Sequence, residues 1–228
     1  MRIVIMSDIH GNVVALEAVL ADIHRHAAPD ALVVAGDLAL VGPRPAEAVA
    51  LLRGLDAAFV MGNCDRYIVD REDDPQVQFA LERLAAADLA FLADLPFGQQ
   101  VEAAPGHDLL VVHANPHNLE DPIKPDMHES LVRPLLDGVD ADALAFGHYH
   151  VPFTRRLDPW LLVDVASVGL PRDGDRRAVY AVLTWDGAAW HAEHRRVPFD
   201  IEAVARDYKA VGFPHADLAA ASLLRARY

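Results

Sequence analysis

Residues that commonly bind metal ions follow five short apolar segments of this 228-residue chain. They are four histidines, two aspartates and one asparagine: Asp8, His10, Asp37, Asn63, His113, His148 and His150. In open α/β sheets, ligands bind beyond the carboxyl ends of the strands, so polar groups that follow several strands can meet there. The sequence therefore predicts a metal centre whose seven ligands come from five strand ends.

The chemistry of these side chains indicates which ions they would bind. Imidazole and carboxylate groups without a thiolate favour Mn, Fe, Zn, Ni or Co over a soft metal or calcium. Asp37 has two carboxylate oxygens, so it can bridge two ions. Two divalent ions about 3.5–4 Å apart would activate a bridging hydroxide and hold both oxygens of an in-line displacement. We therefore expect a hydrolytic centre with two divalent metal ions.

The spacing of the candidate ligands fits this expectation. In an extended segment, residues two positions apart point the same way, so Asp8 and His10 can reach one ion. A small residue that lets the backbone turn sharply precedes three of the ligands, namely Gly36, Gly62 and Gly147. Gly-Asp and Gly-Asn are by themselves ordinary turn dipeptides, and Gly-His-x-His is somewhat more specific. Their joint occurrence after five apolar runs is what points to a metal centre.

The segments between the ligands alternate between strand and helix patterns. Apolar runs at 2–6, 31–35 and 57–61 predict strands, and helical spacing predicts helices over 13–27 and 46–53. This β-α-β-α-β order implies right-handed crossovers and a parallel sheet.

The second half of the chain has a different pattern. Residues 75–94 and the tail at 200–227 are typical of helices. The strands expected between them lie near 99–103, 108–113, 143–147, 152–157, 160–165, 178–184 and 189–196. Short turns at 158–159 and 186–187 predict hairpins and a partly antiparallel second sheet. No linker-like stretch interrupts the chain, so we expect one domain over residues 1–228.

Composition limits the classes of partner. The chain has 20 Lys and Arg against 34 Asp and Glu, a formal charge of −14. An extended nucleic-acid surface needs a basic footprint, so we do not expect that partner. A small phosphorylated substrate, such as a nucleotide, is compatible with this charge because bound divalent cations change the local sign.

The cysteine content and the hydropathy of the chain indicate where in the cell the protein is expected. Cys64 is the single cysteine, so no intrachain disulfide can form. The apolar run at the start is too short for a signal peptide, and no stretch approaches the ~20 apolar residues of a membrane span. We expect a cytoplasmic protein without a membrane partner. The sequence leaves the oligomeric state open, a homo-oligomer included.

At these residues the chain resembles the calcineurin-like metallophosphoesterase superfamily. The superfamily pattern is D-x-H, G-D, G-N followed two residues on by D or E, a lone His and G-H-x-H, and the chain matches it between residues 8 and 150. Residues 167–175 also look like a loop of the small bacterial phosphodiesterase-like branch, which includes diadenosine tetraphosphate hydrolases. The resemblance implies an α/β fold of two packed mixed β-sheets flanked by helices, a four-layer sandwich.

The resemblance also divides the ligands between two ions. One ion would be held by Asp8, His10, Asp37 and His150, and the other by Asp37, Asn63, His113 and His148. Asp37 is then the bridge, as its chemistry suggests independently. No catalytic residue is implied beyond the metal-activated hydroxide.

The chain departs from the superfamily at one position. Many members have a histidine after the motif asparagine, thought to protonate the leaving group, whereas this chain has Cys64. A neutral thiol is a poor general acid, and a general acid typically contributes about 10²–10⁴-fold in rate. We expect a preference for leaving groups that need little protonation, such as aryl esters or nucleotide phosphates. Cys64 would otherwise be only a small buried residue.

Two residues are candidates for binding the substrate phosphate. Asn12 opens the first helix, whose N-terminus favours anions, but it could equally be a plain N-cap. Arg172 could form a guanidinium clamp, or one half of a surface pair with Asp173 or Asp175. Tyr149 lies between two ligands, and we expect it to face away from them and pack. The long polar loop at 114–130 is expected to be functional because of its length.

The sequence thus favours a dinuclear metal-dependent phosphoesterase that hydrolyses small phosphodiesters or nucleotides through a metal-bridged hydroxide. One alternative is a phosphoprotein phosphatase, which shares the metal core but needs an open groove. Another is a metal-binding regulatory module without catalysis, which Cys64 motivates.

Overall fold

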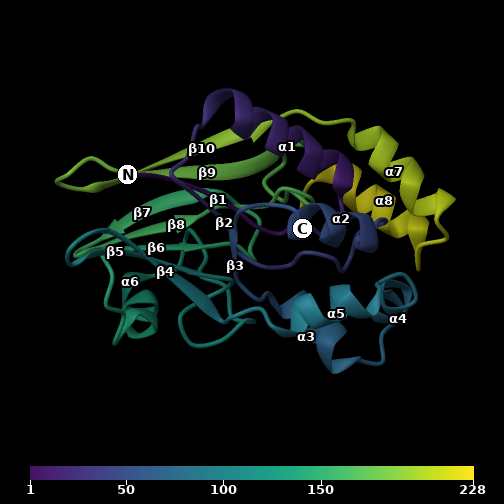
Figure 1. Cartoon of the computed structure of the whole chain (residues 1–228), viewed down its shortest axis with the longest axis horizontal. Coiled ribbons are helices and arrows are strands. Elements are labelled where there is room, and N and C mark those ends of the chain that lie inside the picture. Colours follow the sequence, from purple (N-terminus) through teal and green to yellow (C-terminus); the bar gives the residue numbers. More distant parts are fainter.

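Two five-stranded mixed β-sheets form the centre of the computed structural model, which describes all 228 residues (Figure 1). The first sheet has the strand order β10 (Trp190–Val197), β9 (Ala178–Trp185), β1 (Arg2–Met6), β2 (Ala31–Val34) and β3 (Ala58–Phe59). The second has the order β4 (Gly98–Ala104), β5 (His107–Val112), β6 (Ala143–Phe146), β8 (Trp160–Asp164) and β7 (Phe153–Leu157).

Helices cover the outer faces of both sheets (Figure 1). The α-helices are α1 (Val13–His26), α2 (Pro45–Arg53), α3 (Asn63–Asp70), α4 (Pro75–Leu81), α5 (Ala86–Ala93), α6 (Glu129–Val132), α7 (Ile201–Ala210) and α8 (Ala216–Arg225). A 3₁₀ turn, η1 (Arg133–Leu136), follows α6. The predicted fold class, two packed mixed sheets flanked by helices, is confirmed.

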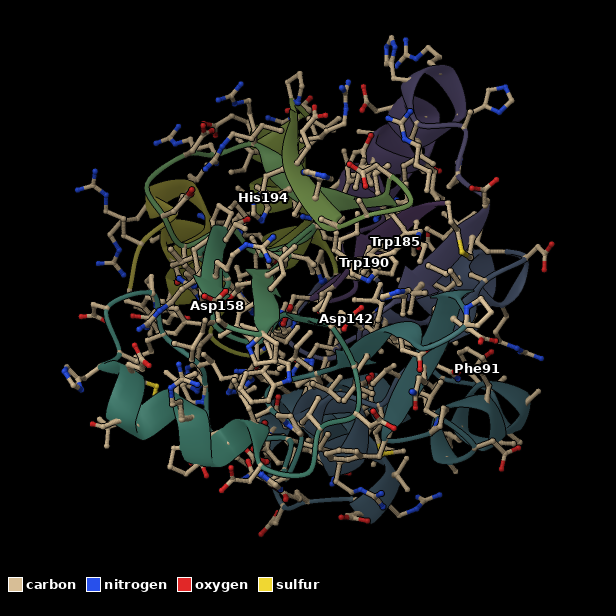
Figure 2. All side chains as sticks on the ribbon, turned by 90° about the vertical axis from the view of Figure 1, so that its left-hand side faces the viewer. Phe91, Asp142, Asp158, Trp185, Trp190 and His194 are labelled. Atoms are coloured by element: carbon tan, nitrogen blue, oxygen red, sulfur yellow. The ribbon has the colours of Figure 1, made fainter.

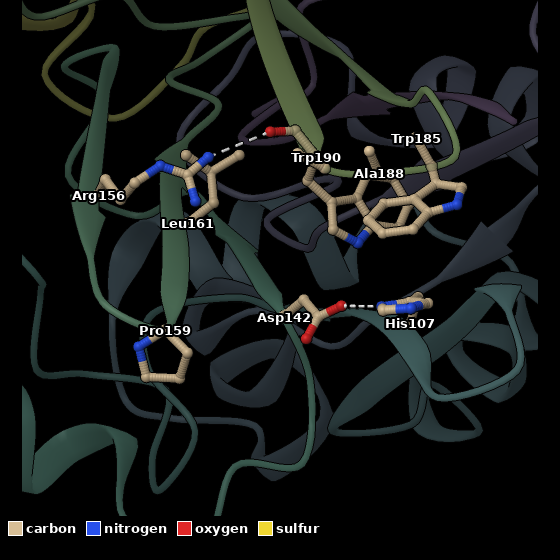
Figure 3. A pocket seen from close by; sticks show the side chains of 9 residues that line it. His107, Asp142, Arg156, Pro159, Leu161, Trp185, Ala188 and Trp190 are labelled. Atoms are coloured by element: carbon tan, nitrogen blue, oxygen red, sulfur yellow. Dashed lines mark hydrogen bonds and ion pairs between the residues drawn. The ribbon is translucent and has the colours of Figure 1, made fainter.

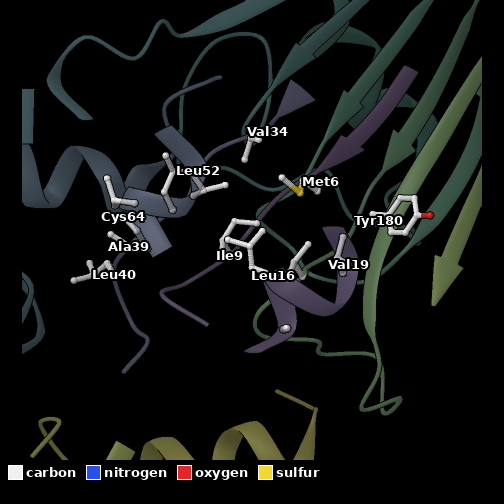
Figure 4. Packing of buried hydrophobic residues seen from close by; sticks show 14 of the residues in the cluster. Met6, Ile9, Leu16, Val19, Val34, Ala39, Leu40, Leu52, Cys64 and Tyr180 are labelled. Atoms are coloured by element: carbon white, nitrogen blue, oxygen red, sulfur yellow. The ribbon is translucent and has the colours of Figure 1, made fainter. Parts of the chain in front are cut away.

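The alternation of side chains along β1 explains the layers. Met6 lies beside Leu16 of α1 on one face of the first sheet (Figure 4), and Val4 belongs to the same buried cluster. Ile3 and Ile5 point to the other face, where they join the side chains of β5, β6 and β8 in the core between the sheets. Since successive side chains of a strand point to opposite faces, a strand that is apolar throughout must be covered on both sides.

The parallel pairing of strands determines which edge of the two sheets carries the candidate ligands. β1, β2 and β3 run parallel in the first sheet, and β5 and β6 run parallel in the second. The five segments that carry the candidate ligands therefore leave the sheets at carboxyl ends of parallel strands.

The prediction for the second sheet is partly wrong. The hairpins at 158–159 and 186–187 both form, but β9 and β10 belong to the first sheet, where β9 pairs antiparallel with β1. The pattern of β9 explains this position, because seven of its eight residues are buried, as in a central strand. The sequence also does not predict α3 or α6, which are short and polar.

At the edge where the parallel strands begin, aromatic residues close the space between the sheets (Figure 2). Trp185 and Trp190 line a cavity of about 220 Å³ there, together with His107, Asp142 and Arg156 (Figure 3). This cavity contains none of the predicted ligands. None of the helices is both long and apolar enough to cross a membrane.

Truncating a side chain in the outer core should destabilise the fold. Leu16 is fully buried against the first sheet, so Leu16→Ala should lower the free energy of unfolding by about 2–5 kcal/mol. Leu218→Ala, at a site that is 71% exposed, should change it by less than about 0.5 kcal/mol. Urea denaturation followed by circular dichroism measures both values, and equal values would contradict the assigned core.

Candidate metal centre

The structure brings all seven predicted ligands together at one edge of the two sheets. Six of them are buried and His148 is partly exposed. Asp8 and His10 follow β1, Asp37 follows β2, and Asn63 is the first residue of α3 after β3. The other three follow the second sheet, as His113 follows β5 while His148 and His150 follow β6.

The side chains form two adjacent groups. In the first, Nε2 of His150 lies 2.8 Å from Oδ1 of Asp8 and 3.3 Å from Nε2 of His10. In the second, Oδ1 of Asn63 lies 2.9 Å from Nε2 of His113 and 3.1 Å from Nδ1 of His148.

Asp37 lies between the two groups. Its Oδ2 is 3.8 Å from Nε2 of His10, and its Oδ1 is 3.5 Å from Nε2 of His113. One carboxylate oxygen thus faces each group, which is the arrangement that a bridging ligand requires.

Backbone carbonyls orient all four imidazole rings. The ring nitrogen that points away from the centre lies 3.0 Å from Leu40 O in His10, 2.9 Å from Ala35 O in His113, 2.7 Å from Glu120 O in His148 and 2.7 Å from Leu170 O in His150. A carbonyl only accepts, so this nitrogen carries the proton. A neutral imidazole then presents a lone pair at its other nitrogen, toward the centre.

The inward atoms fit a metal ion. Nε2 of His10 and His150 and Oδ1 of Asp8 are all acceptors, and they lie within 2.8–3.7 Å of one another. A bound metal ion would stabilise all of these contacts at once, whereas a proton can be shared by only two acceptors. Donor atoms about 2.1 Å from one ion lie about 3.0–3.4 Å apart, which is close to the observed spacing.

Burial and neighbouring charges shift the pKa values of the ligands. Burial lowers the pKa of His10 and of His148 below the usual value, and in His148 the neighbouring His113 adds to the effect. Burial alone would also lower the pKa of His113, but the negative charges of Asp37 and Asp8 raise it above the usual value. Burial by itself would raise the pKa of Asp8, but the adjacent His150 lowers it well below its usual range. Neutral imidazoles and an ionised carboxylate are the forms that coordinate a divalent cation.

The backbone at the ligands differs from the predicted extended conformation. Asp8, His10, Asp37, His148 and His150 all have positive φ, between 50° and 66°. This left-handed conformation is uncommon for residues other than glycine and often marks functional sites. The loop after β1 pairs with the loop after β2 through backbone hydrogen bonds, which hold the first three of these residues in place.

The three glycines that precede ligands allow neighbouring atoms to approach closely, as well as allowing the backbone to turn. Gly36 has a φ of +89°, as the prediction of a sharp turn requires. Gly62 has an ordinary φ of −98°, but a Cβ atom there would overlap Oδ1 of Asp37. At Gly147 a Cβ would overlap Oδ2 of Asp8. These two positions are small because a ligand carboxylate occupies the space.

Asp65 has a role that the sequence does not reveal. Its buried carboxylate accepts hydrogen bonds from the backbone N–H groups of Asp37, Leu38 and Gly62, at 2.9–3.0 Å. It therefore joins the loop that carries Asp37 to the loop that carries Asn63. Its motif position after Asn63 is the signal that could have identified it.

The polar loop after His113 contributes through its backbone. Its Asn115 and Asn118 side chains accept and donate hydrogen bonds within the loop. The folded loop places the carbonyl of Glu120 on His148, and the Glu120 carboxylate accepts from Tyr67 of α3. The loop thus fixes the orientation of one candidate ligand.

Cys64 lies in the first turn of α3 beside Asp37. Its backbone N–H donates to Oδ1 of Asp37 at 2.9 Å, and its side chain is buried in the outer core. Burial, and then the negative charge of Asp37, raises the pKa of the Cys64 thiol well above its usual value. The thiol therefore stays neutral and is a weak proton donor, as the sequence predicts.

The two predicted phosphate-binding residues are engaged elsewhere. Oδ1 of Asn12 caps α1 by accepting from Ala15, and its amide nitrogen donates to Gly169 O. The guanidinium of Arg172 donates to Ser222 and to Arg227 O at the end of α8.

These contacts leave each phosphate-binding role a prediction. The alternative of a surface pair between Arg172 and Asp173 or Asp175 is wrong, because Arg196 binds Asp173 and both Arg177 and Arg196 bind Asp175.

Comparison with known proteins identifies the class. Residues 1–188 match the family model of the calcineurin-like phosphoesterase superfamily domain. The chain therefore belongs to this superfamily, and the predicted resemblance is confirmed.

Particular relatives share most of the chain. An uncharacterized protein, MJ0912 of Methanocaldococcus jannaschii, is 29% identical over 225 residues, with 88% of each chain covered. The solved metallophosphoesterase of Sphaerobacter thermophilus is 29% identical and superposes with a TM-score of 0.83, over 99% of this chain and 100% of that one. The phosphoesterase YfcE of E. coli is 26% identical, with a TM-score of 0.53 over 82% of this chain and 90% of that one.

A methyl group at Gly62 should disrupt the centre. Gly62→Ala would push the Asp37 carboxylate out of place, so we expect a loss of about 1–3 kcal/mol in folding free energy, together with loss of Mn²⁺ affinity. Gly54→Ala is the control, because the nearest atom to its Cβ lies at 3.4 Å and its φ is negative. Thermal denaturation and Mn²⁺ titration measure these effects, and unchanged Mn²⁺ affinity in Gly62→Ala would contradict the assigned packing.

Proposed function

We propose that this protein is a phosphoesterase that uses two divalent metal ions to hydrolyse small phosphodiesters or nucleotides. The observation that carries the proposal is the inward orientation of four imidazole lone pairs in two adjacent groups, with Asp37 between them. Membership of the phosphoesterase superfamily supports the same chemistry.

Each residue of the centre has a defined task in this proposal. Asp8, His10 and His150 hold one ion, Asn63, His113 and His148 hold the other, and Asp37 is shared. When bound, Mn, Fe, Zn, Ni or Co ions lower the pKa of the attacking water and neutralise the phosphoryl oxygens. The protein keeps the donor atoms deprotonated and in place, and no side chain forms a covalent intermediate.

Two features favour a small substrate over a phosphoprotein. The cavity that adjoins His148 has a volume of about 460 Å³, within the range of small-molecule sites. The second feature is the neutral thiol of Cys64, which favours leaving groups such as aryl alcohols and phosphates that depart without a proton. The acidic charge of −14 argues against extended DNA or RNA as substrate.

Removing the bridging charge should abolish activity. Asp37→Asn should lower the rate of bis(p-nitrophenyl) phosphate hydrolysis in Mn²⁺ by at least ~10²-fold, since one side chain serves both ions. Elemental analysis should find fewer than two ions per chain. Asp126→Asn, at an exposed position, is the charge-matched control and should behave like the wild type. Full activity of Asp37→Asn would refute the bridging role.

Two substrate outcomes would favour the other functions. Faster hydrolysis of a phosphopeptide than of any nucleotide would indicate a phosphoprotein phosphatase. Full metal content without hydrolysis of any phosphoester would indicate a regulatory metal-binding module and contradict the proposal.

Restoring a proton donor should change leaving-group preference. Cys64→His should raise the rate on an alkyl diester such as diethyl phosphate by about 10²-fold relative to bis(p-nitrophenyl) phosphate, because only the alkoxide needs protonation. Cys64→Ser, which adds no such acid and is closer in size, should leave the ratio of the two rates unchanged. A ratio that is the same in all three proteins would contradict the assigned effect of Cys64.

A further inference from the structure

A cavity opens directly beside the metal centre. It is lined by Pro122, Lys124, His148, Tyr149 and Tyr228 and has a volume of about 460 Å³. His148 belongs to both the cavity and the second group of ligands. A molecule whose phosphate reaches the centre can therefore extend into this cavity.

One wall of the cavity is aromatic. The rings of Tyr149 and Tyr228 stack with their centroids 5.3 Å apart and their planes inclined by 25°. The Tyr228 hydroxyl donates to the backbone carbonyl of Tyr149, which fixes the pair. Tyr228 is nevertheless 69% exposed, so the pair presents aromatic surface to solvent. Tyr149 packs, as the sequence predicts, and it also lines the cavity.

Lys124 adds a positive charge that no carboxylate pairs with, and it lies over the Tyr149 ring. Nζ of Lys124 lies 5.5 Å from the centre of the Tyr149 ring, and no carboxylate lies within 4 Å of it. Lys209, the other lysine, is paired with Asp217. A free ammonium group beside a metal centre on a chain with a net charge of −14 is suited to an anion.

We propose that this cavity binds the base and a second phosphate of a nucleotide substrate. The base stacks on the exposed ring of Tyr228, which is supported from behind by Tyr149 and accepts any planar ring. Lys124 pairs with a phosphate next to the one at the metal ions. This inference rests on the proposed function and narrows its substrates to nucleotides with more than one phosphate. Such substrates suit Cys64, because a phosphate leaves without a proton from the enzyme.

Direct binding measurements test this proposal. Calorimetry on the Mn²⁺-loaded protein should show AMP binding at least ~10-fold more tightly than ribose 5-phosphate, which lacks only the base. Tyr149→Ala and Tyr228→Ala should each reduce this ratio by at least ~5-fold, whereas Tyr149→Phe, which keeps the ring and the hydrogen bond from Tyr228, should retain it. Phe97→Ala, at an exposed aromatic residue outside the cavity, should keep the wild-type ratio.

The role of the positive charge of Lys124 is tested by the same binding measurements. ADP should bind more tightly than AMP, and Lys124→Met should remove this advantage while Lys209→Met keeps it. Mn²⁺ content is measured for every variant, so that a change at Tyr149 is not confused with loss of metal. Equal affinity of the wild type for AMP and ribose 5-phosphate would overturn the proposal, as would ratios that the tyrosine variants leave unchanged.

Hydrolysis of bis(p-nitrophenyl) phosphate by the same samples separates the two proposals. Hydrolysis without preference for the base contradicts the nucleotide cavity alone. Preference for the base without hydrolysis of any phosphoester supports the cavity and contradicts the proposed function.

Discussion

The metal centre depends on the hydrogen bonds that four histidines donate to backbone carbonyls. Ala35 and Leu40 after β2, Glu120 in the polar loop and Leu170 before β9 supply these carbonyls, from three segments of the chain. Because a neutral imidazole has one N–H group, an outward donor means an inward lone pair. The two sheets and their loops thus set the direction of each lone pair, and with it the affinity of the centre for metal ions.

The other features of the metal centre follow from the close approach of the five segments that carry its ligands. Five ligands adopt a left-handed backbone, a conformation that costs roughly 1–3 kcal/mol for each residue outside glycine. Gly62 and Gly147 leave room for carboxylates, and Asp65 holds two of the loops together with three hydrogen bonds. Apolar packing on both faces of the first sheet offsets this strain.

The sequence predicts those features of the fold and the site that depend on the local pattern of apolar and polar residues. Apolar runs locate the strands, and the polar residues after them locate the ligands, because a buried strand must end where polar side chains begin. What depends on tertiary partners is not predictable in this way. The partner of β9 is an example, since burial on both faces does not say which sheet the strand joins. Arg172 is another, because its contacts with α8 come from residues 50 or more positions away. Tyr149 was expected to pack, and only the structure shows that Tyr228 turns it into one wall of a cavity.

Crystallography of the Mn²⁺-soaked protein, with anomalous differences recorded near the Mn absorption edge, would locate the bound ions. We expect two anomalous peaks, one on each side of Asp37. One should be bonded to Nε2 of His10 and His150, and the other to Nε2 of His113 and Nδ1 of His148. A single peak, or coordination through the nitrogens that now face the carbonyls, would contradict this expectation.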